Sequence, residues 1–221
     1  MKFEVLTLFP ERYEAYVNSG LPAKAAKKGL FQIKAVNLRD FADPKRSGRV
    51  DDTPYGGGPG MLLEIGPVDR ALQSMDRSGP VILFTPRGKT LNQRMVERYA
   101  TLQNVTLLCG YYEGVDERIA AHLANEHVSL GDFVLGSGDL AALCLIEAVT
   151  RLLPGYMGSD ESATEESSNL EGLLEYPQYT RPRDYNGWLV PEVLLSGDHG
   201  KIREWRRQQQ ELITKQRKSH E

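Results

Sequence analysis

Apolar and polar positions follow two alternating patterns along the first 150 residues. Short apolar runs have the length of strands buried in a sheet, and the segments between them place apolar residues at helical spacing. Strands are predicted at 1–9, 31–38, 81–84, 105–109 and 127–130, and helices at 10–28, 66–78, 92–102, 113–124 and 139–152. This alternation predicts an α/β domain with a mainly parallel sheet.

The composition changes after this region. From 152 to 180 there is no Lys or Arg but there are six Asp or Glu, and acidic, Ser-rich composition of this kind is typical of a mobile linker. Apolar residues at helical spacing return between Ile202 and Ile213. We therefore expect a first domain at 1–157, a mobile linker at 158–170 and a small, mostly helical domain at 171–221.

The charge is uneven along the chain. The net charge of −3 argues against a general nucleic-acid binder, yet residues 201–221 hold seven Lys or Arg and three Glu. Such asymmetry predicts a basic terminal module that binds a polyanion. A solvated helical tail is the alternative interpretation.

Targeting signals and cysteine chemistry are not apparent. No apolar run reaches the roughly 18 residues of a membrane-spanning helix, and residues 1–10 lack the apolar core and cleavage site of a signal peptide. Cys109 and Cys144 both lie in apolar stretches, so both are expected to be buried thiols. A cytoplasmic location is predicted.

The densest glycine run is Gly56-Gly57-Gly58-Pro59-Gly60, which follows Asp51, Asp52 and Tyr55. Each glycine in ordered structure costs roughly 0.5–1 kcal/mol of extra backbone entropy. The run therefore predicts close approach of a ligand or of a second backbone segment, and a plain surface turn is the alternative.

Three other glycine-bearing segments follow predicted strands: Thr85–Gly88, Cys109–Gly114 and Leu130–Gly138. Ligands of open parallel sheets bind beyond the carboxyl ends of the strands, so these segments predict one concave, backbone-lined pocket. No Walker A loop or dinucleotide fingerprint is present. A nucleoside and a phosphate both remain as ligands, and an α/β enzyme acting on a small phosphorylated substrate is one interpretation.

The common catalytic signatures are missing. There is no G-x-S-x-G elbow and no His-Glu-x-x-His, and the four histidines show no metal-ligand spacing, so no metal site is predicted. The remaining candidates are charged residues near the loops: Asp51, Asp52, Glu113, Asp116, Asp132, Arg151, Glu165 and Glu166. Asp51, Asp52 and Glu113 stand out because they lie within glycine-rich loops.

Taken in order, several motifs resemble those of the bacterial tRNA (guanine-37-N1)-methyltransferases, the TrmD family of the SPOUT superfamily. They are Leu8-Phe9-Pro10, Arg39-Asp40-Phe41, Val50 to Met61, Cys109-Gly110, Tyr112 to Arg118, Leu130 to Leu135, Ser162 to Glu165, Leu195 to His199, Ile202 and Trp205-Arg206. These motifs extend across nearly the whole chain.

The resemblance implies a fold and a cofactor. It implies a deep trefoil knot in the first domain, an obligate homodimer, and S-adenosylmethionine (SAM) as the methyl donor. It also allows Mg²⁺ as an accessory ion, although no dedicated site is visible. By matching position, the donor-binding residues are Leu83, Thr85, Pro86, Gly110, Tyr112, Leu130, Gly131, Asp132, Phe133, Val134, Leu135 and Gly138.

The resemblance further implies transfer of a methyl group to N1 of the guanine at position 37 of a tRNA. The general base matches Glu166 in the linker, and Arg151 matches the arginine that stabilises negative charge on the guanine O6. The residues expected on the tRNA side are Asp51, Tyr55, Gly56, Gly57, Glu113, His199 and Arg203. The linker is expected to order when tRNA binds.

The chain also departs from the family pattern. Glu166 replaces an aspartate, which makes Glu165 a second candidate base, and Tyr111 replaces an Arg or His. Gly136-Ser137-Gly138-Asp139 replaces Ser/Thr-Gly-Gly-Glu, and the basic module is shorter than in the family. A related protein that binds SAM and RNA, with weak activity or another RNA target, is therefore the alternative.

Overall fold

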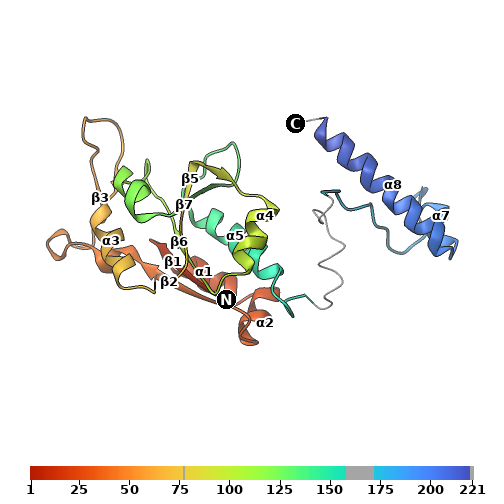
Figure 1. The fold of residues 1–221 in the computed structure, drawn as a ribbon, viewed down its shortest axis with the longest axis horizontal. Helices are drawn as coiled ribbons and strands as arrows, with labels where there is room; N and C mark the ends of the chain where they lie inside the picture. Colours follow the sequence, from red (N-terminus) through yellow and green to blue (C-terminus); the bar gives the residue numbers. More distant parts are fainter. Residues whose placement is uncertain (77, 158–171, 220–221) are drawn as a thin grey trace. The chain divides into compact units, whose positions relative to one another are not determined.

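The computed structural model describes residues 1–76, 78–157 and 172–219 of the 221-residue chain. The chain separates into two compact units, Met1–Gly158 and Ser159–Glu221, and each is described by itself. Figure 1 shows the first unit in red to green and teal, and the second in blue.

A five-stranded sheet forms the centre of the first unit. Its strands are β1 (Lys2–Thr7), β2 (Gln32–Asn37), β5 (Val81–Thr90), β6 (Asn104–Leu108) and β7 (Glu126–Ser129). They are ordered β2-β1-β6-β5-β7, and every neighbouring pair is parallel. The expected parallel α/β sheet is therefore confirmed, and the carboxyl ends of all five strands lie at one edge.

Helices and shorter turns connect these strands. They are α1 (Glu11–Val17), α2 (Gly20–Lys27), α3 (Ile65–Gln73), α4 (Gln93–Ala100) and α5 (Asp139–Arg151), with the 3-10 turns η1 (Leu38–Phe41) and η2 (Pro44–Arg46) and the π-helical turn η3 (Ile119–Leu123). Helix α5 packs on β1 and against α4. Its buried residues Leu145, Ile146 and Val149 join the core around the sheet.

Several predicted elements need correction. The helix expected at 10–28 is two helices, because Ser19 adopts an extended backbone between them. The helix expected at 113–124 is reduced to η3, since residues just before it bond to Met61 and Leu63 instead. Strand β5 continues beyond Phe84 to Thr90 after a bulge.

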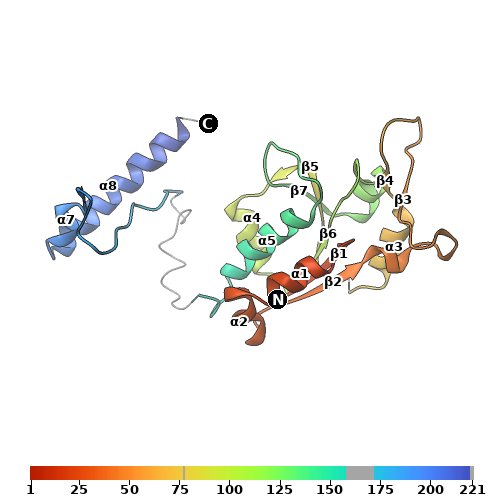
Figure 2. The same ribbon diagram turned by 180° about the vertical axis from the view of Figure 1, so that it is seen from behind.

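A second, very small sheet carries the glycine run. Strands β3 (Asp51–Asp52) and β4 (Leu62–Leu63) pair antiparallel, and isolated bridges join Leu62 to Tyr112 and Leu63 to Val115. The loop between β3 and β4 stands out from the body of the unit in both views (Figures 1 and 2). Tyr55 in this loop is fully exposed.

The second unit contains a short hairpin and a long helix. Strands β8 (Asp184–Tyr185) and β9 (Trp188–Leu189) pair antiparallel, and α7 (Glu192–Leu195) and α8 (His199–Lys218) follow. The Asp198 side chain accepts hydrogen bonds from the backbone N–H groups of Gly200 and Lys201, which caps α8 as expected for this residue type. The Leu174 N–H bonds to the buried Thr214 hydroxyl of α8 at 2.8 Å. Among the described helices, none combines the length and apolar character needed to cross a membrane.

Candidate active site

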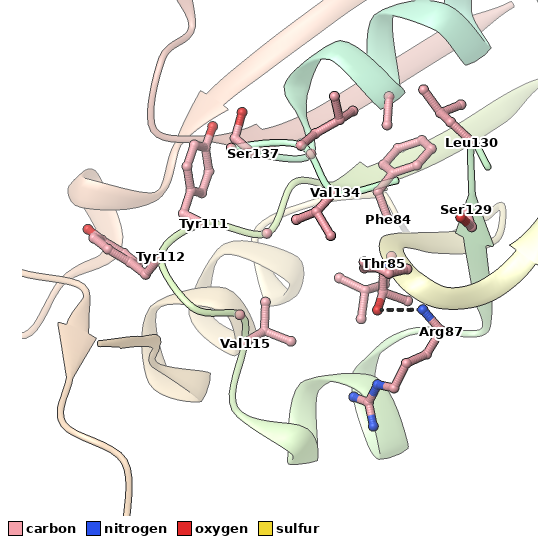
Figure 3. A pocket seen from close by; sticks show the side chains of 18 of the residues that line it. Phe84, Thr85, Arg87, Tyr111, Tyr112, Val115, Ser129, Leu130, Val134 and Ser137 are labelled. Carbon is pink, nitrogen blue, oxygen red and sulfur yellow. Dashed lines mark hydrogen bonds between the residues drawn. The ribbon is translucent and has the colours of Figure 1, made fainter. Parts of the chain in front are cut away.

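The three glycine-bearing loops meet at the carboxyl edge of the sheet and enclose a cavity of about 420 Å³ (Figure 3). It is lined by Leu62, Leu83, Phe84, Thr85, Pro86, Arg87, Gly110, Tyr111, Tyr112, Glu113, Gly114, Val115, Val128, Ser129, Leu130, Phe133, Val134, Leu135, Gly136, Ser137, Gly138 and Ala141. Most of the lining is apolar side chain or bare backbone, with a few hydroxyl and charged groups. Ligand pockets usually have this composition.

The first loop is a bulge inside β5. Both Phe84 and Lys89 pair with Val128 of β7, so the residues between them bulge from the sheet, and residues 85–87 line the cavity. A side chain at Gly88 would lie 2.4 Å from the Val128 backbone nitrogen, so only glycine allows this close return to β7. The Arg87 N–H bonds to the Thr85 hydroxyl at 3.4 Å, as the dashed line in Figure 3 shows.

The second loop follows β6 and is fastened to the glycine run. The Glu113 N–H bonds to the Met61 carbonyl at 3.0 Å. A Cβ atom at Gly60 would lie 2.3 Å from Cγ of Glu113, so glycine at this position leaves room for that side chain. Tyr112 has a φ of 60°, a left-handed conformation that is strained for a tyrosine.

The third loop joins β7 to α5 and contacts the second. The Gly138 N–H bonds to the Gly110 carbonyl at 2.9 Å. A Cβ atom at Gly138 would lie 2.8 Å from Cα of Cys109, so the two backbone segments touch directly. Val134 near the tip of this loop is 83% exposed. The base of the loop is therefore fixed, while its tip faces solvent.

Charged side chains surround the second loop. Partial burial, together with the nearby negative charge of Asp51, raises the pKa of Tyr112, and the positive charge of Arg39 opposes that shift. Hydrogen bonds from Arg118 lower the pKa of Asp116. The Tyr112 phenol thus lies near both a carboxylate and a guanidinium, and its raised pKa keeps it protonated at neutral pH.

The predicted donor-binding residues all line the cavity except Gly131 and Asp132. The Phe133 ring packs against Gly131, within 2.8 Å of the position that a Cβ atom would take, and Phe133 lines the cavity in its place. The cavity thus brings together residues as distant in the sequence as Leu83 and Gly138, which are 55 positions apart.

The predicted tRNA-side residues are less closely grouped. Glu113 lines the cavity and Asp51 lies near Tyr112, whereas Tyr55, Gly56 and Gly57 belong to the projecting loop and are not part of the lining. His199 and Arg203 lie in α8 of the second unit.

Of the two predicted catalytic residues, the structure describes only Arg151, which is not part of the cavity lining. Arg151 is the last residue of α5. At 1.5 Å per residue, it lies about 18 Å along the helix from Asp139, at the cavity end. Glu165 and Glu166 lie outside the described residues.

Several lining residues were not predicted. Phe84, Tyr111, Val115, Ser129, Ser137 and Ala141 face the same cavity. They belong to or adjoin the three loops, so a prediction of whole loops would have included most of them. Ala141 lies in the first turn of α5, where only the packing of this helix places it at the cavity.

Cys144 corrects another expectation, because its side chain is exposed and only Cys109 is buried. Leu140, one turn earlier on α5, is 56% exposed. Burial of Cys144 is expected from the apolar stretch around it, but part of the apolar surface of this helix faces outward.

The parallel α/β sheet, with a ligand cavity at its carboxyl edge, defines the class of open α/β proteins that bind ligands at strand ends. Residues 1–220 match the family model described as tRNA (Guanine-1)-methyltransferase TrmD. The chain belongs to this family, which confirms the resemblance of its motifs.

Three relatives carry the name tRNA (guanine-N(1)-)-methyltransferase. The relative from Nitratidesulfovibrio vulgaris is 48% identical over 208 residues, which are 94% of this chain and 48% of the relative. The relative from Microcystis aeruginosa is 49% identical over 221 residues, 99% of this chain and 95% of the relative. The relative from Dehalococcoides mccartyi is 48% identical over 213 residues, 95% of this chain and 85% of the relative. This chain thus spans about half the length of the first relative and most of the other two.

Proposed function

We propose that this protein is a methyltransferase that uses S-adenosylmethionine to methylate N1 of the guanine at position 37 of tRNA. The observation that supports this most is the cavity enclosed by the three glycine-bearing loops in a chain of the TrmD family. A second candidate, a family member that binds donor and RNA with weak activity, is an outcome of the experiment below.

The cavity suits a nucleoside that carries an amino-acid chain. Its volume of about 420 Å³ lies within the 300–1,000 Å³ typical of small-molecule sites. Leu83, Leu130 and Leu135 offer apolar walls for a purine, and the bare backbone at Gly110 and Gly138 leaves room for close approach. When bound, S-adenosylmethionine supplies an electrophilic methyl group attached to a positively charged sulfur.

The protein must then make the guanine N1 nucleophilic. N1 carries a proton, and we assign its removal to the carboxylate of Glu166 or Glu165. A positioned general base contributes about 10²–10⁴-fold. As the N1–carbon bond forms and the carbon–sulfur bond breaks, negative charge on O6 is stabilised by the Arg151 guanidinium. We assign contacts with the purine to Glu113, in the loop after β6, and to Asp51, in β3.

The position of Arg151 favours a site that is shared between two copies of the chain. Within one chain, this residue lies at the end of α5 away from the cavity. Leu140 and Cys144, one turn apart on the same helix, are exposed, and so are Phe133 and Val134 on the loop that precedes it. We therefore propose a homodimer in which the cavity of one protomer receives Arg151 and the linker base from the other.

A knot accounts for the contact between the second and third loops. The backbone of Gly138 touches that of Cys109 and Gly110, although the whole of β7 lies between these segments along the chain. Threaded chains are rare in proteins. We propose that these segments form the trefoil knot of the SPOUT fold and that it creates the backbone-lined cavity.

The second unit supplies the basic surface for the tRNA. Its helix α8 carries Lys201, Arg203, Arg206 and Arg207 in its first half and Lys215, Arg217 and Lys218 in its last turns. Contacts of such residues with phosphates position a nucleic acid without reading its sequence. The guanine must leave its stack to reach the cavity, as other base-modifying enzymes require.

The deciding experiment measures methyl transfer from labelled S-adenosylmethionine to two tRNA transcripts that differ only in guanine or adenine at position 37. We expect transfer to the guanine transcript alone. Donor binding without transfer to either transcript would favour the second candidate.

Two sets of variants test the assigned roles. Glu166→Ala and Glu165→Ala are compared separately, and one of them should lower the rate at least about 10-fold. If both retain the wild-type rate, the base lies elsewhere. Arg151→Gln should be inactive alone, and mixing it with the cavity variant Gly138→Ala should restore activity if one site draws on two protomers.

A further inference from the structure

A buried carboxylate lies beside the cavity but is neither part of its lining nor used by the proposed chemistry. Asp139 is the first residue of α5, and no part of it is exposed. Its position in the first turn is favourable for a negative charge, because the helix dipole is positive there. A charge buried this completely needs hydrogen-bonded partners.

Five side chains supply those partners. Oδ1 of Asp139 accepts hydrogen bonds from the hydroxyls of Thr7 at 2.7 Å and Tyr13 at 3.0 Å. Oδ2 accepts from Arg12 Nη1 at 2.6 Å, the Tyr111 hydroxyl at 2.7 Å and the Ser137 hydroxyl at 3.1 Å. Both oxygens are therefore fully engaged, and Arg12 balances the charge.

The partners come from separate parts of the fold. Thr7 ends β1, Arg12 and Tyr13 lie in α1, Tyr111 belongs to the loop after β6, and Ser137 to the loop before α5. Tyr111 and Ser137 are also lining residues, and Figure 3 shows them close together on one side of the cavity. Asp139 thus joins two of the three cavity loops to β1 and α1.

The hydroxyl partners are held in their donating form. Burial raises the pKa of both Tyr13 and Tyr111 well above that of an exposed tyrosine. Burial likewise raises the pKa of the Cys109 thiol, which contacts the Tyr13 hydroxyl at 3.2 Å. The phenols remain protonated, so each directs its one hydrogen-bond donor to an acceptor. A carboxylate meets that need with two acceptor oxygens, whereas an amide offers one oxygen and turns a donor toward the others.

We propose that Asp139 is a positioning residue for the donor cavity. Its carboxylate holds the Tyr111 phenol and the Ser137 hydroxyl in place, and through them it holds the second and third loops at the spacing that S-adenosylmethionine requires. The proposal rests on the proposed function only in so far as that donor binds in this cavity.

The test compares Asp139→Asn with a control on the same pair of helices. In the control, Tyr16→Phe, the hydrogen bond from the Tyr16 hydroxyl in α1 to Glu147 in α5 is removed, and neither residue lines the cavity. Donor affinity is measured by calorimetry, KM and kcat by methyl transfer, and stability by thermal unfolding.

We expect Asp139→Asn to raise the Kd and KM for S-adenosylmethionine at least about 10-fold, or about 1.4 kcal/mol of binding free energy. At saturating donor, kcat and the affinity for tRNA should change much less. Tyr16→Phe should lower the unfolding temperature and leave donor affinity unchanged. Tyr111→Phe, which keeps the ring and loses one hydroxyl, should show the same split between KM and kcat to a smaller degree.

The outcomes separate the two proposals. If Asp139→Asn and Tyr111→Phe unfold earlier but bind the donor as wild type does, Asp139 is only a stabilising residue and the inference is wrong. If Asp139→Asn does not fold, Tyr111→Phe decides the matter alone. Wild-type protein that binds the donor without methylating tRNA would overturn the proposed function and leave this inference intact, whereas absence of donor binding would overturn both.

Discussion

Two loops beside the cavity differ in how they are held. The loop that ends at Gly138 is fixed at its base by backbone contact with Cys109 and Gly110 and by the buried Asp139 cluster. The loop between β3 and β4 carries more glycine, but a Cβ atom at Gly56 or Gly57 would meet nothing within 4 Å. Glycine therefore serves two purposes here. In the first loop it allows close packing of backbones, and in the second it allows left-handed turns in an open loop.

The same contrast distinguishes the two ends of the proposed site. Buried hydrogen bonds hold the loops of the donor end together, which favours a cavity that is formed before the ligand binds. The guanine end projects into solvent and is joined to the cavity through Met61, Leu62 and Leu63, which pair with the loop after β6. A large substrate such as tRNA suits an open surface that closes on binding.

The largest effect is expected at the donor end. Gly138→Ala places a Cβ atom 2.8 Å from Cα of Cys109, so one of the two loops must move. A displacement of this kind costs about 10²-fold in activity. Gly136→Ala is the matched control in the same loop, because a Cβ atom there meets nothing within 4 Å. Donor affinity by calorimetry checks the pair, and equal affinities would refute direct backbone packing at Gly138.

A smaller effect is expected at the guanine end. Gly60→Ala and Gly57→Ala both force alanine to a positive φ, of 76° and 79°, so both carry a similar backbone cost of roughly 1–2 kcal/mol. Only the first also displaces the Glu113 side chain. We expect Gly60→Ala to lower kcat on tRNA at least about 10-fold more than Gly57→Ala, or about 1.4 kcal/mol.

Donor affinity should be similar in both variants of the β3–β4 loop. The measurements are steady-state methylation at saturating donor, and calorimetry with the donor alone. Matching kcat values for Gly60→Ala and Gly57→Ala would show that Glu113 does not depend on the space at Gly60.

The second unit should respond differently from either loop. Arg203→Gln on α8 should weaken tRNA binding and lower the slope of log affinity against log salt by about one, because one phosphate contact is lost. Gln208→Ala, an exposed neutral position of the same helix, should leave that slope unchanged. Filter binding between low and moderate salt provides the measurement. An unchanged slope in Arg203→Gln would remove this residue from the tRNA surface.

The smallest effect concerns stability far from both loops. Hydrogen bonds from Arg98 lower the pKa of Glu126, and the nearest contacts are 2.5 and 2.8 Å. A lowered carboxylate pKa adds stability above the ordinary value of about 4.3, and that stability is lost as the pH falls through the folded-state pKa. Arg98→Met should therefore lower stability at pH 7 by up to about 1 kcal/mol.

The difference in the free energy of unfolding between Arg98→Met and wild type should shrink once the pH is about one unit or more below 4.3, the ordinary glutamate pKa. Arg87→Gln is the control, since its partner Glu117 and Arg87 itself are both largely exposed. Urea unfolding at several pH values tests the pair. A difference that persists in acid would mean that Arg98 acts through packing on Tyr99 instead.

Much of the first unit could be predicted from local patterns. The five strands of the main sheet and the helices near α3, α4 and α5 follow from apolar runs and helical spacing. The three cavity loops follow from one rule, that parallel strands place their carboxyl ends at one edge. The motifs of the glycine run and of these loops also sufficed to indicate the family.

Other features depended on partners distant in the sequence. The segment after Tyr112 has helical character, yet it pairs with Met61 and Leu63, more than 45 positions earlier. Cys144 lies in an apolar helix, and nothing local indicates which side of that helix faces outward. Gly131 and Asp132 lie in the correct loop but not in the cavity lining, and the Phe133 ring packs against Gly131.

The sequence by itself determined most element types, the parallel sheet and the loops that form the cavity, because these depend on periodicity and on the order of strands along the chain. Only the tertiary structure identified the Asp139 cluster and the contact between Gly60 and Glu113. Thr7 and Asp139 are 132 positions apart, and their hydrogen bond exists because β1 and α5 pack together. Burial and partners of this kind arise from packing across the fold, which no local pattern records.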